Sequence, residues 1–136
     1  YKDFYKYLES TFFEKKFQEK ENPEKKGFRN NILVDCLTNM VSNIIFENTD
    51  IDWDTPTKEQ IKKCDEVVEK QVEELLNISG EFENMIIVSN ELGMGIVPSY
   101  PLGRYFREIA GKMNQLVAEK ADEVYFVVSG IPMKIK

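Results

Sequence analysis

Polar residues that could do chemistry follow two short apolar runs of this 136-residue chain. Asp35 closes the run at residues 32–34, and Asn90 and Glu91 come shortly after the run at residues 85–88. An acid at the end of a buried strand is where nucleotide-binding domains hold Mg²⁺, directly or through water. It is equally a place for an Asp that caps the next helix. The spacing therefore leaves both readings of Asp35 open.

The residues after position 88 carry a second ambiguous set. Asn90 and Glu91 could sense a phosphate, or they could order a turn, in which Asn is common. Gly93 and Gly95 would let the backbone approach a ligand closely, although a lone Gly-x-Gly is also frequent in ordinary loops. This segment predicts a loop with some capacity for ligand binding.

Two arginines, Arg104 and Arg107, are three residues apart in a predicted helix and so occupy neighbouring positions on it. They could present two guanidinium groups to phosphate, and could do so across a subunit interface. The alternative is a solvated helix face on which Glu108 is the local partner.

The chain lacks the residues of a complete catalytic centre. It contains no histidine, which excludes a His general base, a Ser-His or Cys-His pair and a His-ligated metal within this chain. The phosphate-loop pattern GxxxxGK[ST] is also missing, because the Gly111-Lys112 pair is followed by Met113. We therefore expect no catalytic residue in these 136 residues.

Length and composition indicate one domain over residues 1–136, and the order of helices and strands given below makes it an α/β domain. Hydrophobic residues make up 42% and charged residues 31% of the chain, which is a globular balance. The 18 basic and 24 acidic side chains give a net charge of −6, which disfavours generic nucleic-acid binding. Apolar runs of about five residues exclude a membrane span, which needs about 20.

Two further features bear on ligand and location. Residues 85–136 hold 6 basic and 5 acidic side chains, so an anionic ligand meets less repulsion there than in the acidic first part. Cys36 and Cys64 form no CxxC pair, and we interpret them as two buried thiols of a reducing compartment, the cytoplasm. Residues 1–20 are charged throughout and do not read as a signal peptide.

The chemistry-bearing residues must be positioned by alternating helices and strands. In chain order we expect a helix over 2–20, a charged loop over 19–27, a strand over 32–34, a helix over 37–45, a polar connection over 48–56, a helix from Thr57 to Ser79 and Gly80, a strand over 85–88, a loop over 93–98, a helix over 102–117, and strands over 124–128 and 133–135. Continuous apolar strands between amphipathic helices are typical of a mainly parallel sheet covered on both faces. Gly80 suits a left-handed helix cap.

In such a sheet ligands bind outside the carboxyl ends of the strands. This rule groups the candidate residues into three sets, which converge if the strands are adjacent. The sets are Asp35, Thr38, Asn39 and Asn43; Ser89, Asn90, Glu91, Gly93 and Gly95; and Ser129 with Gly130.

Two segments resemble a known enzyme family. Residues 32–43 (ILVDCLTNMVSN) look like its LLECIT-x-MVTN segment. Residues 87–98 (IVSNELGMGIVP) and 104–115 (RYFREIAGKMNQ) resemble its VxNEVGMGIVP and RxFRDxAGxxNQ run almost position by position. The family is adenosylcobinamide kinase / adenosylcobinamide-phosphate guanylyltransferase, and the resemblance covers about residues 30–136.

The resemblance implies a P-loop NTPase-like, RecA-like fold and homotrimers that bind nucleotide near subunit contacts. Enzymes of this family phosphorylate the aminopropanol hydroxyl of adenosylcobinamide with ATP or GTP. They then transfer GMP from GTP to that phosphate through a guanylylated histidine, giving adenosylcobinamide-GDP. The implied ligands are adenosylcobinamide and GTP or ATP with Mg²⁺.

The first strand, P-loop and nucleophilic His of the family precede the matched region. The chain thus resembles the C-terminal two-thirds of a member and lacks the first strand–P-loop–helix unit. We expect the complete protein to be the enzyme of cobalamin biosynthesis and this chain alone to be inactive. We also expect the chain to oligomerise or to swap elements, because its sheet edge and apolar helix faces would be uncovered. The alternative is a non-catalytic remnant that binds nucleotide or corrinoid, or only assembles with a partner.

Site residues follow from the matched positions. Asp35 occupies the acidic strand-end position expected to act on Mg²⁺–nucleotide. Asn90 and Glu91 occupy the NE position and are expected nucleotide-binding residues. Thr38, Arg104 and Arg107 are weaker nucleotide-binding candidates.

Overall fold

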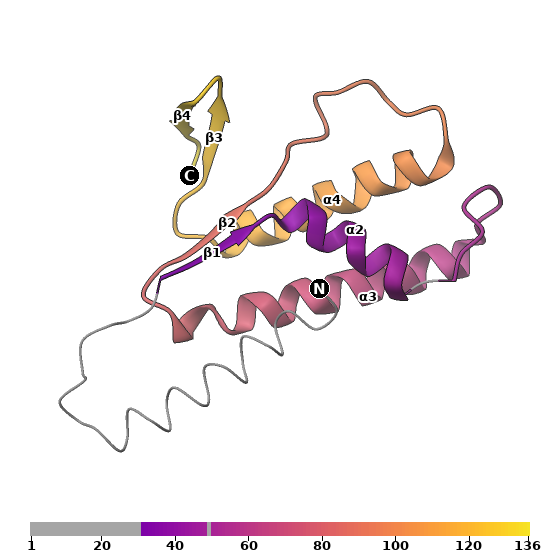
Figure 1. Cartoon of the computed structure of the whole chain (residues 1–136), viewed down its shortest axis with the longest axis horizontal. Coiled ribbons are helices and arrows are strands. Elements are labelled where there is room, and N and C mark those ends of the chain that lie inside the picture. Colours follow the sequence, from indigo (N-terminus) through magenta and orange to yellow (C-terminus); the bar gives the residue numbers. More distant parts are fainter. Residues whose placement is uncertain (1–30, 49) are drawn as a thin grey trace, which may run out of the picture. The chain divides into compact units, whose positions relative to one another are not determined.

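The computed structural model describes residues 31–48 and 50–136 (Figure 1). Its elements in chain order are β1 (Ile32–Asp35), α2 (Leu37–Asn48), α3 (Lys58–Asn77), the short 3₁₀ turn η2 (Ser79–Glu81), β2 (Met85–Val88), α4 (Pro101–Lys120), β3 (Tyr125–Val128) and β4 (Ile131–Lys134). The helix expected over residues 2–20 and the loop expected over 19–27 lie outside the described residues. The chain divides after Asn90 into two compact units, each considered by itself.

In the first unit β1 and β2 form a parallel pair, as predicted. The register sets Ile32 against Met85 and Asp35 against Val88, so the carboxyl ends of both strands lie side by side. Parallel neighbours need a long crossover connection, and α2 and α3 provide it. The prediction of an α/β fold with a parallel sheet and helices is confirmed for this unit.

The core of this unit joins the sheet to both helices. Val34 of β1 packs with Leu75 and Ile78, and Met40 and Ile87 pack against that cluster. The stripes predicted from the apolar spacing are buried, as expected for amphipathic helices. They comprise Leu37, Val41, Ile44 and Ile45 on α2 and Cys64, Val68, Val72 and Leu75 on α3. Both cysteines remain thiols, with Cys64 fully buried and Cys36 only half-buried.

Helix α3 starts as the sequence predicts and ends earlier. Thr57 forms a capping box, in which its hydroxyl accepts the Gln60 N–H at 3.2 Å and the Gln60 side chain accepts the Thr57 N–H at 2.9 Å. The predicted left-handed cap at Gly80 is wrong. The helix stops at Asn77 with Ile78 as the capping residue, because η2 continues the chain with 3₁₀ bonds from Glu81 N–H to the Ile78 carbonyl.

The other face of the parallel pair carries apolar side chains that are exposed. Leu33 on β1 and Ile86 and Val88 on β2 share this face and alternate with the inward residues. Parallel sheets are normally covered on both faces. This exposure accords with the expectation that the chain associates through uncovered apolar surface, which stays a prediction.

The second unit consists of a loop over residues 91–100, α4 and a hairpin. The hairpin corrects the predicted topology: among residues 31–48 and 50–136, β3 pairs only with β4, antiparallel and in a sheet separate from β1 and β2. Ser129 (φ 51°) and Gly130 (φ 80°) form its turn. Positive φ at both central residues is the requirement of a two-residue type I′ hairpin.

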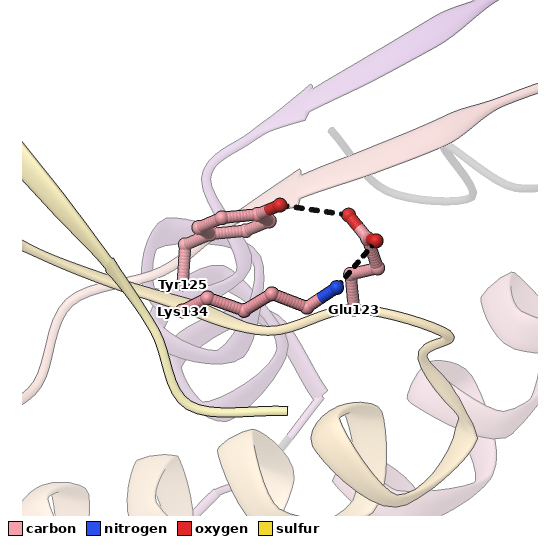
Figure 2. Close-up of polar contacts among 3 residues, drawn as sticks. All are labelled: Glu123, Tyr125 and Lys134. Atoms are coloured by element: carbon pink, nitrogen blue, oxygen red, sulfur yellow. Dashed lines mark hydrogen bonds and ion pairs between the residues drawn. The ribbon is translucent and has the colours of Figure 1, made fainter.

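Polar contacts fix the open end of this hairpin. Tyr125 donates its hydroxyl to Glu123 Oε2 at 2.8 Å, and Lys134 Nζ lies 2.6 Å from Glu123 Oε1 (Figure 2). The hydrogen bonds from Lys134 and Tyr125 lower the pKa of the Glu123 carboxyl. The same contacts to Glu123 raise the pKa of Tyr125 and of Lys134. Lys136 Nζ donates to the Ala118 carbonyl at 2.9 Å, at the C-terminal end of α4, where a cation is favoured.

None of the helices within the described ranges combines the length and the apolar character that crossing a lipid bilayer requires.

Candidate functional site

The carboxyl ends of β1 and β2 bring together residues from two of the three predicted sets: Thr38 from the first set, and Ser89 and Asn90 from the second. Thr38, in the first turn of α2, is only 6% exposed. Its Oγ1 accepts the Asn90 N–H at 2.9 Å and lies 3.2 Å from Ser89 Oγ. A single hydroxyl thus links the segment after β1 to the segment after β2, 52 residues later.

Asp35 stands at this edge with its side chain exposed. The helix-cap reading of Asp35 is not what the backbone shows, because the first hydrogen bond of α2 runs from Met40 N–H to the Cys36 carbonyl at 3.1 Å. The residue whose carbonyl accepts the first helical bond is the capping residue, so the cap is Cys36 and Asp35 precedes it. The Asp35 carboxylate therefore lies at the end of β1 and not at the capping position of α2.

The side chains at the carboxyl ends of β1 and β2 determine what kind of metal site this edge could form. Within the part of the chain that the structure describes, no group of three or more His, Cys, Asp or Glu side chains could enclose an ion. Mg²⁺ is usually held by one or two carboxylates, with water and phosphate oxygens as its other ligands. One exposed carboxylate at Asp35 fits a Mg²⁺ that arrives with a nucleotide, and it does not fit a cage of protein ligands.

Asn39 and Asn43 are on α2, four residues apart, and both are exposed. The third predicted set, Ser129 with Gly130, is the hairpin turn between β3 and β4 and not part of the parallel edge. Its inclusion was wrong because the apolar run before it does not reveal whether the strand pairs parallel or antiparallel.

In the second unit the Glu91 side chain turns back onto its own loop. Glu91 Oε1 accepts the Gly93 N–H, and Gly95 N–H is 3.4 Å from the Leu92 carbonyl. These contacts correspond to the reading in which Glu91 orders a turn. Its assignment as a nucleotide-binding residue stays a prediction.

Arg104 and Arg107 hold the same loop from α4, a role that the sequence reasoning missed. Arg107 Nη2 donates to the Gly93 carbonyl. Arg104 Nη1 donates to the Ser99 carbonyl and lies 3.3 Å from the Pro98 carbonyl. Arg107 Nη1 is buried and has no hydrogen-bond partner among the described residues. The sequence feature that could have indicated this anchoring role is the position of both arginines, which follow a glycine-rich loop within about two helical turns.

Gly103, also missed, explains how the loop enters α4. A Cβ at this position would lie 2.7 Å from the ring of Tyr100 and 2.8 Å from Cβ of Pro98. Only glycine leaves room for both side chains against the first turn of the helix, which begins at Pro101. The loop over 91–100 is thus fixed at both its ends.

Comparison with known proteins places this site in a family context. The model of the family "Cobinamide kinase / cobinamide phosphate guanyltransferase" matches residues 6–135, a longer part of the chain than the resemblance over residues 30–136. The bifunctional adenosylcobalamin biosynthesis protein CobU of Salmonella typhimurium is 41% identical over 110 residues, which cover 77% of this chain and 58% of that protein.

Two further relatives agree with this result. CobU of Escherichia coli is 40% identical over 110 residues, covering 77% of this chain and 58% of the relative. The bifunctional adenosylcobalamin biosynthesis protein CobP of Pseudomonas aeruginosa is 36% identical over 106 residues, covering 77% of this chain and 53% of the relative. The chain spans about half the length of the curated relatives it matches.

Proposed function

Because the chain belongs to the cobinamide kinase / cobinamide phosphate guanyltransferase family, we propose that it is the nucleotide-binding part of an enzyme of cobalamin biosynthesis. The whole protein phosphorylates the aminopropanol hydroxyl of adenosylcobinamide with ATP or GTP. It then transfers GMP from GTP to that phosphate and forms adenosylcobinamide-GDP. The fold is RecA-like, of the P-loop NTPase type.

The observation that carries this proposal is the hydroxyl bridge between Thr38 and Asn90 at the carboxyl edge of the parallel pair. In open α/β sheets this edge is where ligands bind. The bridge fixes the backbone after β2 relative to the start of α2, so that the strand ends hold one geometry when a nucleotide arrives. Phosphoryl transfer depends mainly on such positioning and on charge neutralisation.

Each candidate residue has a role in this proposal. Asp35 binds the Mg²⁺ that accompanies ATP or GTP, and the metal neutralises charge on the phosphates. Thr38 positions Asn90, and Asn90 and Glu91 line the nucleotide. Arg107 is a weaker nucleotide-binding candidate, whose guanidinium would add a cationic contact to phosphate. Arg104 supports the same loop.

The first test is covalent labelling with GTP that carries its label on the α-phosphate. The whole protein is expected to take up GMP and to phosphorylate adenosylcobinamide. The 136-residue chain is expected to take up none, because it contains no histidine. Label on the isolated chain would contradict the histidine mechanism, and a whole protein without either activity would contradict the proposed function.

The second test addresses Asp35. Replacing it by asparagine removes a charged contact to the metal–nucleotide complex, worth about 1.5–3 kcal/mol. Turnover is therefore expected to fall roughly 10- to 100-fold at fixed Mg²⁺. The control is Asp54→Asn, another exposed acid, which is expected to leave turnover unchanged. Equal rates for Asp35→Asn and wild type would remove Asp35 from the site.

The alternative function, a non-catalytic remnant that binds nucleotide or corrinoid or only assembles with a partner, is favoured by the missing histidine and phosphate loop. Nucleotide binding without turnover by the whole protein would support it. The enzyme proposal also includes assembly into a homotrimer and location in the cytoplasm. Light scattering of the whole protein tests the homotrimer, and fractionation of the cells that produce the protein tests the location.

A further inference from the structure

The loop before α4 displays an apolar surface that the nucleotide chemistry does not explain. Residues 92–103 include no charged side chain, in a chain that is 31% charged. Four large side chains of this segment are highly exposed, and we call them the loop surface: Met94 (79%), Ile96 (97%), Val97 (61%) and Tyr100 (59%). Large exposed apolar side chains that gather on a surface mark sites of binding, so four of them in one loop make this loop a candidate binding surface.

The backbone that carries the loop surface is anchored at both its ends. At the start, Glu91 and Arg107 bind the N–H and the carbonyl of Gly93. At the end, Arg104 binds the Ser99 carbonyl, and the lack of a side chain at Gly103 lets the Tyr100 ring pack against α4. Fixing a binding loop in advance lowers the entropy lost when a ligand binds. The apolar side chains are therefore presented by a prepared loop.

The chemistry of the loop surface selects its occupant. Phosphates are bound by cationic groups and N–H donors, and the loop surface has neither among its side chains. A corrin ring offers a broad face of methyl groups and conjugated carbon, rimmed by amides. Aliphatic and thioether side chains suit that face, and the Tyr100 hydroxyl can hydrogen-bond an amide at the rim.

We propose that Met94, Ile96, Val97 and Tyr100 dock the corrin ring of the cobinamide substrate. This inference rests on the proposed function. Met94 is only four positions after Asn90, a chain length of at most roughly 14 Å. The loop that docks the ring is therefore joined to the proposed nucleotide-binding segment by only a short stretch of chain. The aminopropanol hydroxyl of the cobinamide must react at the bound nucleotide, so the two ligands need to be held by neighbouring segments.

The test uses the whole protein with the double substitution Met94→Ser and Ile96→Ser. The matched control is Ile131→Ser on β4, a residue that is 67% exposed and outside the loop. The KM for adenosylcobinamide in the kinase reaction is expected to rise about tenfold or more in the double variant, because two apolar contacts are lost. The KM for the nucleotide and the melting temperature are expected to stay unchanged, and the control is expected to resemble wild type.

A direct measurement accompanies the kinetics. Titration of protein into adenosylcobinamide, followed by the visible spectrum of the corrinoid, gives its Kd without turnover. A further variant, Gly95→Ala, adds a methyl group where the nearest atom is 3.7 Å away, and so tests the approach of the ring without disturbing the fold. Weaker corrinoid binding by both variants supports the docking surface.

Three outcomes would overturn the inference. Unchanged KM and Kd in the double variant, with an active wild type, would reject the docking surface and leave the proposed function intact. A change in oligomeric state by light scattering, with both substrates affected, would assign the loop surface to contact between copies of the chain. A wild-type protein that neither binds nor phosphorylates cobinamide would reject the proposed function together with the inference.

Discussion

Thr38→Val is the sharpest perturbation of the strand-end geometry. Valine has nearly the shape of threonine, so the substitution replaces the hydroxyl by a methyl group without leaving a cavity. The position is almost fully buried, and its Oγ1 makes the 2.9 Å bond from Asn90 N–H and the 3.2 Å bond with Ser89 Oγ. What the variant removes is the link between the two strand ends.

The magnitude follows from those two bonds. Each is worth about 0.5–1.5 kcal/mol in net stability, and the added buried methyl group offsets part of the loss. We expect Thr38→Val to lower the free energy of unfolding by about 1–2 kcal/mol. An energy of this size changes an opening equilibrium roughly 5- to 30-fold. The Asn90 amide, which donates to Thr38, should exchange with solvent faster by that factor.

The assay is amide hydrogen exchange at Asn90, followed by NMR and combined with urea unfolding. Thr38→Ser is the matched control, because it keeps the hydroxyl and loses only the methyl group. Its Asn90 exchange should stay near that of wild type. If Thr38→Val exchanged at the wild-type rate, the hydroxyl would not hold the strand ends together, and the main support for the nucleotide site would be lost.

Three further predictions concern the scaffold. Glu123→Gln should return the raised pKa of Tyr125 toward about 10, followed by NMR of the tyrosine ring. In wild type the contact stabilises the hairpin below the unfolded pKa of Tyr125 and is lost as pH rises through the folded value. Gly111→Ala should raise stability by about 0.5–1 kcal/mol, because its site in α4 is open, whereas Gly103→Ala should lower the melting temperature by crowding the loop. Thr57→Ala should cost about 1 kcal/mol in urea unfolding through its lost cap. A stability loss for Gly111→Ala, or a gain for Gly103→Ala, would contradict the packing described for α4.

Local pattern was enough to predict most of the described elements. Apolar runs at residues 32–34 and 85–88 became β1 and β2, because a strand buried on its inner face needs only a few consecutive apolar residues. The spacing of Cys64, Val68 and Val72 located the inner face of α3. The Thr57 cap was predictable because its Gln60 partner is three residues away.

Pairing over long distances was not predictable in the same way. The apolar run that became β3 fits a parallel or an antiparallel partner equally well, and its partner β4 was set by the turn at Ser129 and Gly130. The bridge from Thr38 to Asn90 spans 52 residues. Sequence placed both residues at strand ends but gave no sign that one hydroxyl joins them.

The loop over residues 91–100 and the helix after it contain residue types that are typical of phosphate binding. In the structure these residues hold the loop in place. Gly93 and Arg107 look in sequence like a glycine loop and a cation for phosphate, yet they bind each other through a carbonyl and a guanidinium. A guanidinium has five N–H donors, so anchoring a loop with one of them leaves others for an anion. The structural and the ligand-binding interpretation of Arg107 are therefore compatible. Substitution of Arg107 distinguishes the two interpretations. Loss of the loop anchor would weaken corrinoid binding, whereas loss of the cation would weaken nucleotide binding.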